Sequence, residues 1–507
     1  MQLSFVVFKT MKKFCVEKTL KTSVGSTRLG HLELPLFTKA EEGNDGSSNG
    51  RSKIDYATPM YFLHTQTGSI PHITAEVLKL IYPTASDTSG QIPPVQISLD
   101  ATAKFIEPLS KFENGVGKFV GLSEHPIFLT IHDPLYLLRS GHNDKFGIAL
   151  WSRHGRRPLS PKQFHEAVTA FKPSISQILS DYDVNPEISG MKRLKKSLER
   201  AEEYTSYVIK QEETTEREKK KNTGFFITIE ASWFLMDEGL ATKAVLRLLE
   251  SQHQIEGVVL AGLSDRFVKK KQEDEVKKDS NGKGSGDSER MDICETLDIE
   301  LLDKMLQNLP ANLPKYVPGP FKLPEMMDLV ARGVDLFDSS LASRMADYAE
   351  ALLLDSVEAI LPSISTTMVA MPSSLSEGLA ERADKAERQE PPSNSEEGEG
   401  AVISLKDKKY FDDFGPLSRF CTCYTCRKHT RSYIHHLYAT DELLGPVLIQ
   451  IHNLSTLDRF FSIMRALVKE NDSPESLLEK SALMRNLLKA RILIKIEKED
   501  KVAVPSV

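Results

Sequence analysis

Short apolar runs alternate with helical patterns over more than half of this 507-residue chain, and this alternation restricts the fold more than any other feature. The runs have the length of strands and are nearly continuous, which is typical of parallel strands buried on both faces. We predict strands at 58–64, 117–121, 126–132, 146–151, 225–230, 257–262 and 333–337. Apolar residues at helical spacing predict helices at 161–171, 191–209, 238–251 and 324–332, and one that begins at Leu457. The alternation indicates an α/β fold, either a (β/α)₈ barrel or an open doubly wound sheet.

Four segments contain too few apolar residues to build a core of their own. They are 40–53, 211–222, 269–290 and 373–400. We expect the first three to be disordered insertions in a domain that spans residues 1–372. The fourth is the expected linker to a C-terminal region at 401–507, whose last helices either pack on the barrel or share in a subunit interface.

Composition excludes several classes of protein. The formal net charge is −6, so the chain as a whole has no electrostatic attraction to nucleic acid, although a local basic patch remains compatible with this value. No run of about 18 apolar residues predicts a transmembrane helix. The N-terminal residues up to His31 lack the apolar core of a secretory signal and are poor in arginine, which favours the cytoplasm over a mitochondrial address.

Three of the five cysteines fall within six residues, in the pattern C-x-C-x-x-C at Cys421, Cys423 and Cys426. Clustered thiolates in one tight turn are typical of a zinc site, and a structural zinc ion takes four protein ligands in a tetrahedron. The fourth ligand must therefore come from elsewhere, and local spacing leaves several histidines open. The candidates are His429, His435, His436 and His452.

The cysteine pattern, with the segment Pro314–Ser340, resembles the tRNA-guanine transglycosylase family. That family ends in C-x-C-x-x-C, followed after 25 residues by a histidine ligand in an H-N dipeptide. In this chain 25 residues separate Cys426 from His452, and Asn453 follows. The resemblance thus implies that His452 completes one structural zinc site per chain. It also implies a TIM (β/α)₈ barrel with a C-terminal zinc-binding subdomain.

The same resemblance assigns Asp338, the last residue of G-V-D-L-F-D, to the position of the family's nucleophile. The alternative is an aspartate in a turn that follows a strand. Three other family motifs are changed here. The D-S-G-G-F-Q loop corresponds to 128–138 with Asp133 nearby, the F-D-E-C strand to 178–184 with Asp181 and Asp183, and the Q-G-G segment to 229–232. In addition, L-P-T-R has become L-A-S-R at 341–344. Catalytic residues are therefore not assigned.

Within the family, the stretch His429–Asn453 is similar to the accessory subunits of the eukaryotic queuine-inserting enzyme. This similarity implies a non-catalytic role in replacing the wobble guanine of tRNAs with GUN anticodons by queuine. The implied partners are a catalytic queuine tRNA-ribosyltransferase subunit, in a heterodimer, and tRNA. Near the cysteine turn, phosphate contacts are open to Arg427, Lys428, Arg431 and the pair His435 and His436, and the alternative is a solvated charged turn. A peripheral association with the mitochondrial outer membrane is left open. Two alternatives are an active transglycosylase that uses Asp338, and a zinc-stabilised RNA-binding adaptor.

Overall fold

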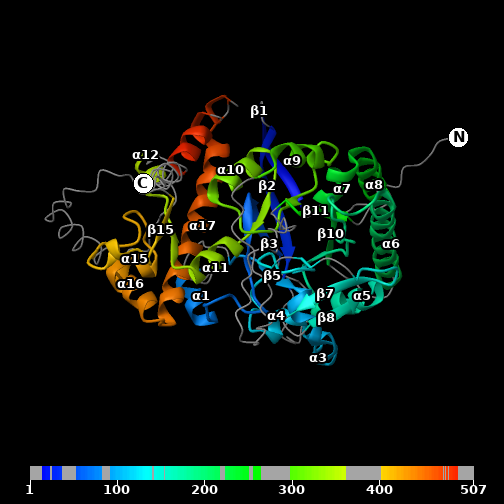
Figure 1. Cartoon of the computed structure of the whole chain (residues 1–507), viewed down its shortest axis with the longest axis horizontal. Coiled ribbons are helices and arrows are strands. Elements are labelled where there is room, and N and C mark those ends of the chain that lie inside the picture. The colour runs from blue at the N-terminus through cyan, green and yellow to red at the C-terminus, as the bar shows by residue number, and fades with distance from the viewer. Residues whose placement is uncertain are drawn as a thin grey trace, which may run out of the picture.

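Eight parallel strands close into a barrel in the part of the chain that this computed structural model describes (Figure 1). The strands follow one another around the barrel in the order β10-β11-β12-β13-β4-β5-β6-β9. The described residues are 14–22, 25–36, 53–82, 92–136, 138–139, 142–152, 155–216, 223–250, 255–263, 297–360, 401–471, 473, 475–477 and 479–488. The closed ring confirms the predicted (β/α)₈ barrel and excludes the open doubly wound sheet.

Each barrel strand is followed by helical segments that cover the outside of the ring. The barrel strands are β4 (Met60–His64), β5 (Val95–Ser98), β6 (Ile127–Thr130), β9 (Ile175–Gln177), β10 (Gly224–Glu230), β11 (Ile255–Ala261), β12 (Lys315–Tyr316) and β13 (Leu336–Asp338). The helices after them are α1 (Ala75–Ile81), α2 (Leu99–Thr102), η1 (Ala103–Phe105), α3 (Ile106–Phe112), α4 (Gly115–Phe119), α5 (Pro161–Phe171), α6 (Met191–Glu216), α7 (Ala231–Met236), α8 (Glu238–Glu250), α9 (Ile299–Leu306), α10 (Leu323–Ala331), α11 (Ser340–Asp347) and α12 (Asp355–Ile360).

The inside of the barrel is filled by aromatic side chains. The ring of Phe128 lies 4.8 Å from that of Phe62, 5.1 Å from that of Tyr316 and 5.6 Å from that of Phe226, centroid to centroid. An antiparallel sheet adds further apolar side chains to this cluster. Its strands are β1 (Phe14–Thr22), β2 (Gly25–Pro35) and β3 (Lys53–Thr58). Residues near the N-terminus, from Phe14 onward, therefore form strands of the fold.

One of the predicted strands is wrong, and another is a strand that lies outside the barrel. Residues 117–121 lie partly in helix α4, where Val116 is buried but Phe119 is exposed, so this short apolar run is not buried on both faces. Residues 146–151 lie in or beside β7 (Ile148–Ser152), which pairs with β8 (Gly155–Leu159) in a separate antiparallel hairpin outside the barrel. The barrel instead uses β5, β9 and β12, which the apolar runs did not indicate.

The predicted insertions fall largely outside the described residues. Segments 269–290 and 373–400 lie entirely outside, as does 40–53 apart from its last residue, which begins β3. Segment 211–222 requires a correction, because α6 continues through its first six residues to Glu216. Its charged, amphipathic sequence extends the helix rather than ending it.

The region after residue 400 packs on the barrel through one long helix. It comprises β15 (Val402–Ser404), η4 (Lys408–Tyr410), α15 (Tyr424–Lys428), α16 (Arg431–Ala439) and α17 (Leu444–Glu470). Strand β15 pairs with β14 (Glu350–Leu352), which follows α11. Helix α17 begins 13 residues before the predicted Leu457, and Leu457, Phe460 and Phe461 belong to the main core. Among the described helices, none is both long and apolar enough to cross a membrane.

Candidate metal centre and barrel mouth

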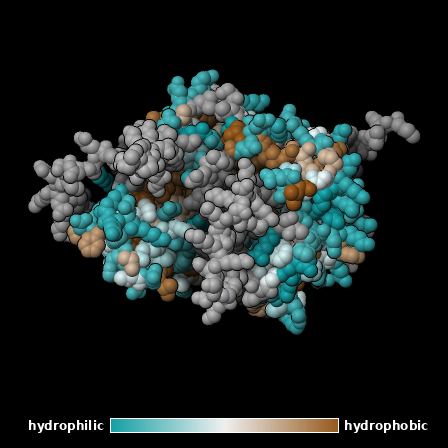
Figure 2. Space-filling view, viewed as in Figure 1, coloured by the Kyte–Doolittle hydropathy of each residue, from teal (hydrophilic) through white to brown (hydrophobic). Residues whose placement is uncertain are grey.

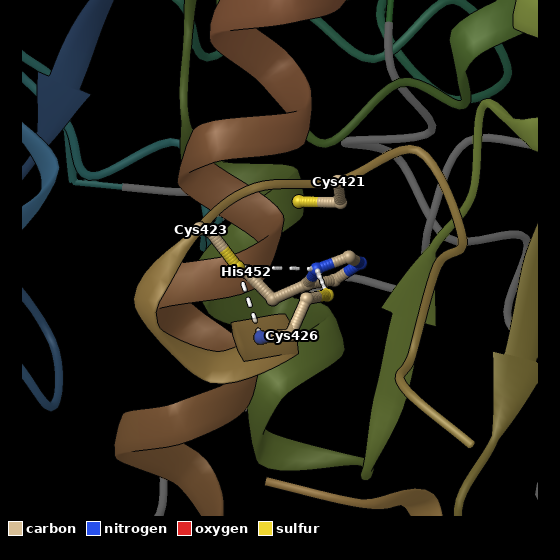
Figure 3. Close-up of side chains that lie close together, drawn as sticks. All are labelled: Cys421, Cys423, Cys426 and His452. Carbon is tan, nitrogen blue, oxygen red and sulfur yellow. Dashed lines mark hydrogen bonds between the residues drawn. The ribbon is translucent and has the colours of Figure 1, made fainter. Parts of the chain in front are cut away.

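The structure brings together the four residues predicted as metal ligands, from two separate elements. Cys421 lies in the segment before α15, Cys423 caps the N-terminus of that helix, and Cys426 lies within it. The Cys423 sulfur accepts a hydrogen bond from the Cys426 backbone N–H, which holds the turn closed. His452 is contributed by the middle of α17 (Figure 3). A turn and a helix 26 residues apart in sequence thus face one another across a buried gap.

The four side chains lie close enough together to hold one metal ion. Their ligand atoms all lie within 4.8 Å of one another. The His452 Nδ1 atom lies 3.3 Å from the Cys426 sulfur and 3.7 Å from the Cys423 sulfur. A zinc tetrahedron with thiolate and imidazole ligands has edges of about 3.5–3.8 Å. The cluster could therefore hold a metal ion with little movement of its side chains.

Electrostatics also favour a cation among these side chains. Hydrogen bonds from the neighbouring Cys423 and Cys426 sulfurs hold the pKa of the Cys421 thiol well below its ordinary value. The same crowding raises the pKa of Cys426. Although burial lowers the pKa of His452, the adjacent Cys421 thiolate raises it to about 10. Several thiolates cannot share so small a buried volume unless a positive charge lies between them.

Contacts behind His452 and Asn453 orient the imidazole. The His452 Nε2–H donates to the Leu352 carbonyl oxygen at 2.8 Å, which fixes the tautomer with Nδ1 free to bind a metal. The Asn453 side chain accepts from the Leu352 backbone N–H and donates to the Glu350 carbonyl. Both residues of the H-N dipeptide therefore attach α17 to β14.

The other candidate histidines have different neighbours. The ring of His429 stacks on Tyr433 at 5.4 Å, and His435 Nδ1 lies 2.6 Å from the Leu405 carbonyl oxygen. His436 is exposed in the last turn of α16. The metal cluster found among the described residues includes His452 and none of these three.

Asp338 lies at the end of β13, at the mouth of the barrel, and is completely buried. Its Oδ2 accepts hydrogen bonds from the Tyr316 hydroxyl at 2.8 Å and the Gly319 N–H at 3.0 Å. Its Oδ1 accepts from the Ser340 N–H at 2.9 Å. Burial raises the pKa of this carboxyl, against the opposing effect of its hydrogen bonds. The carboxylate at the family's nucleophile position is therefore enclosed by its own barrel.

Asp133 forms part of a second buried network at the mouth. Its Oδ1 lies 2.9 Å from the Nε2 of His64, whose Nδ1 lies 3.4 Å from the Ser343 hydroxyl. That hydroxyl also accepts from the side-chain amide of Gln450 in α17. The sequence did not indicate His64, because no motif joins residues so distant in the chain. The only available signal was a histidine at the end of a predicted strand.

Asp181 is completely buried and forms ion pairs with two arginines. Arg193 donates to both of its carboxylate oxygens, at 2.6 and 2.8 Å, and Arg200 donates to Oδ2 at 2.7 Å. Asn143 donates to Oδ1 at 2.9 Å. Burial would raise the pKa of Asp181, but these hydrogen bonds, first of all those from Arg193, lower it. Asp183 is partly buried and lies 3.8 Å from Arg193.

The remaining residues singled out in the sequence differ in how far they are buried and in what they contact. Residues 229–232 span the end of β10 and the start of α7 and are buried. Arg344 of L-A-S-R lies in α11 with its guanidinium 3.5 Å from the centroid of the Tyr348 ring. Arg431 is buried and pairs with Asp413, so it is not placed to contact a phosphate, whereas Lys428 is exposed and Arg427 is half-buried.

Comparison with known proteins shows the family of this chain. A family model described as "Queuine tRNA-ribosyltransferase" matches residues 28–485. Relatives named "Queuine tRNA-ribosyltransferase accessory subunit 2" occur in Caenorhabditis briggsae (30% identity, covering 91% of this chain and 100% of the relative) and in Xenopus laevis (29%, covering 84% and 92%). The human protein of that name is 28% identical over 82% of this chain and 89% of its own length. This chain belongs to the queuine tRNA-ribosyltransferase family.

Proposed function

We propose that this chain is the non-catalytic subunit of a heterodimeric queuine tRNA-ribosyltransferase. In this assembly a catalytic subunit replaces the wobble guanine of tRNAs with GUN anticodons by queuine. The observation that carries the proposal is the state of Asp338, which is fully buried and accepts three hydrogen bonds from its own barrel. The names of the relatives support the same role.

Base exchange requires a carboxylate that can reach C1′ of a ribose, and a second group that handles the purine proton. Asp338 is directed at Tyr316 and Gly319 rather than at a substrate. The carboxylates at the positions of the family's purine pocket also bind side chains of this chain. Asp133 contacts His64, and Asp181 forms ion pairs with two arginines. A chain of this kind is suited to support a reaction that occurs in its partner.

We also propose that Cys421, Cys423, Cys426 and His452 hold one Zn²⁺ ion with a structural role. Three sulfurs and one imidazole nitrogen within 4.8 Å of one another form a ligand set that zinc prefers, and four protein ligands leave no position for water. When bound, the ion neutralises the clustered thiolates. The site joins the turn before α15 to α17, and through His452 to β14.

The partner surface is proposed to lie on the zinc-bearing segment. Several large side chains there are exposed, including Phe411 (75%), Phe414 (76%) and Leu443 (85%), with Tyr433 nearby on α16. Tan and brown side chains are seen over α15 and α16 on the left of Figure 2. Aromatic residues are enriched at protein interfaces, and exposed clusters of them mark partner sites. The catalytic subunit is the partner that the proposed function requires.

The deciding experiment compares labelled queuine incorporation into tRNA by this chain alone, by a catalytic subunit alone and by the two together. The proposal expects activity only when the catalytic subunit is present, enhancement by this chain, and co-elution of the two. Incorporation by this chain alone would contradict it. In that case the active alternative also expects a covalent adduct with tRNA that disappears in Asp338→Ala.

A cytoplasmic location and a peripheral association with the mitochondrial outer membrane stay predictions. Both are checked by fractionation of cells that express the tagged chain. If the chain recovers with organelles, high-salt washing should release it, because no described helix can cross a membrane.

A further inference from the structure

The hairpin β7–β8 and the loop before it concentrate positive charge in an otherwise acidic chain. Residues 136–160 contain five basic side chains and one acidic one, whereas the whole chain has a net charge of −6. The basic residues are Arg139, Lys145, Arg153, Arg156 and Arg157. This segment follows β6, so it emerges at the same end of the barrel as Asp338. In Figure 1 it lies beside α5, across the view from α15 and α16.

Three cations of this segment that the structure describes are exposed and form no ion pair with a described carboxylate. Arg139, Lys145 and Arg156 are exposed, and no carboxylate of the described residues forms an ion pair with any of them. Arg157, in contrast, donates to the Ala103 carbonyl oxygen and anchors β8 to the barrel. Unpaired cations grouped on one surface attract a polyanion, because each contact with a phosphate releases a bound counterion.

Two aromatic rings lie among these cations. Phe146 is 68% exposed, and the Lys145 ammonium lies 4.9 Å from its ring centroid. Trp151 is partly exposed and lies opposite Arg156 in the hairpin register. The Arg139 guanidinium lies 5.6 Å from the Trp151 ring. Proteins bind unpaired nucleotides with exposed aromatic rings, which stack on the bases, and with cations, which contact the phosphates.

The loop that presents Phe146 is held rigidly. The Asp144 carboxylate accepts from the N–H groups of Phe146 and Gly147, and Asn143 accepts from the Ala149 N–H. Gly147 is packed so closely that a Cβ would lie 2.2 Å from the Leu159 carbonyl oxygen. Because the backbone on both sides of Phe146 is already held, less backbone entropy is lost when its exposed ring binds a ligand.

Hydrogen bonds also connect this loop to Asp181, the residue at the position of the family's guanine-reading group. Asp181 accepts from Asn143, and Arg200, which pairs with Asp181, also donates to the Asn143 carbonyl. Tyr204 of α6 donates to the Asp144 carbonyl at 3.2 Å. The buried carboxylate thus holds the base of the loop. Asp181 lies in the segment that replaces the family's F-D-E-C strand. A carboxylate there that holds the loop, and does not bind a base, agrees with this replacement.

We propose that Arg139, Lys145, Phe146, Trp151 and Arg156, here named the basic hairpin, form a docking site for unpaired nucleotides of tRNA. The two rings stack on bases, and the three cations contact phosphates. The identity of the RNA rests on the proposed function, whereas the charge and the exposed rings do not. A negatively charged membrane and the catalytic subunit are other possible occupants, and the experiment separates them.

Tryptophan fluorescence offers a direct measurement on the isolated full chain. It has two tryptophans, and Trp233 is completely buried with its Nε1–H bonded to Ser197. Titration with a transcribed tRNA that carries a GUN anticodon is expected to quench Trp151. Trp151→Phe should remove the quench while filter binding stays within about threefold, because phenylalanine still stacks. A quench that persists in this variant would overturn the proposal.

Charge removal tests the phosphate contacts. The triple variant Arg139→Ala, Lys145→Ala, Arg156→Ala should weaken tRNA binding at least tenfold, and lower the slope of log Kd against log salt by about 2. Phe146→Ala should weaken binding about fivefold or more. Two matched controls remove exposed side chains elsewhere: the triple variant Lys21→Ala, Lys243→Ala, Lys469→Ala, and the single variant Leu246→Ala. Both should leave the affinity for tRNA and its salt dependence unchanged.

In the heterodimer the basic-hairpin variants should raise KM for tRNA and leave kcat unchanged. Unchanged tRNA affinity, with lost binding to phosphatidylserine vesicles or to the catalytic subunit, would overturn the inference in favour of that other occupant. The two proposals fail separately. If no heterodimer forms, the accessory role fails, but the fluorescence titration on the chain alone still decides whether the basic hairpin binds RNA.

Discussion

The Tyr316 hydroxyl donates a hydrogen bond to Asp338 across the end of the barrel, with 2.8 Å between the two oxygens. Both side chains are completely buried, and the tyrosine ring also belongs to the aromatic filling of the barrel. The Asp338 carboxylate is thus held in a buried contact within its own barrel. This pairing leads to the first two predictions.

Asp338→Asn is expected to leave turnover of the heterodimer within about twofold of the unsubstituted complex. The physical reason is that Asp338 contacts no substrate in the proposed assembly. Steady-state queuine incorporation checks this, with the asparagine substitution of the catalytic subunit's own nucleophile as the control that should abolish turnover. A loss of several orders of magnitude from Asp338→Asn would restore the active alternative.

Tyr316→Phe is expected to lower the free energy of unfolding by about 1–3 kcal/mol. The substitution removes one donor from a buried carboxylate and leaves its oxygen poorly satisfied. Urea denaturation measures the change, and Tyr136→Phe, at a part-buried position, serves as the milder comparison. Equal stability of Tyr316→Phe and the parent chain would mean that water replaces the hydroxyl.

Cys426→Ser is expected to abolish stoichiometric zinc and to lower the melting temperature by about 10 °C, because a structural metal site contributes several kcal/mol to folding. Metal analysis of the purified chain, together with a thermal scan, tests both. Cys15→Ser is the matched control, since Cys15 is exposed and outside the cluster. Retention of one zinc ion per chain in Cys426→Ser would remove this ligand from the site.

Lys315→Met is expected to stabilise the chain in a pH-dependent manner. Burial, with the nearby Arg28, lowers the pKa of Lys315 from 10.5 to about 8. The folded protein therefore disfavours the charged amine, and this cost is complete below about pH 8 and disappears as pH rises through 10.5. The gain from methionine should be on the order of 3 kcal/mol at pH 7 and vanish above pH 10.5. A gain that does not depend on pH would show that packing, not charge, is responsible.

Phe411→Ser combined with Phe414→Ser is expected to weaken the heterodimer at least about thirtyfold without changing the melting temperature of the isolated chain. Both rings are about three-quarters exposed, so they contribute to an interface rather than to the fold. Analytical ultracentrifugation of the mixed subunits measures the affinity. The control is Leu246→Ser on α8, and equal effects of the two variants would place the interface elsewhere.

Much of the fold could be predicted because the spacing of apolar residues along the sequence indicates the longer helices and strands. Helix α5 occupies the predicted 161–171, and its Ser160 and Gln163 form the reciprocal cap that a helix start requires. The strands β5, β9 and β12 have two to four residues each, too few to show a pattern. The start of α17 was placed too late because residues 448–454 are all buried. Polar residues such as Gln450 and Asn453 are buried there together with the apolar ones, so the sequence shows no alternation of a polar and an apolar face.

The candidate site likewise has a part that the local sequence indicates and a part that depends on tertiary packing. The three cysteines are neighbours in sequence, and their pattern alone indicates a metal site. Choosing His452 required a family resemblance, because the distance from Cys426 to α17 depends on tertiary packing. The network of His64, Asp133 and Ser343 joins strands and helices far apart in the chain. No local pattern encodes such a network.

The attachment of α17 to β14 has a consequence for how the polypeptide could be divided. Strand β14 pairs with β15 across residues 361–400, and the side chains of His452 and Asn453 bind β14 from the other side. The two portions of the chain are therefore joined by non-covalent contacts on both flanks of that stretch. A version expressed as two polypeptides, ending at 360 and starting at 401, should reassemble into one working subunit, as split reporters do.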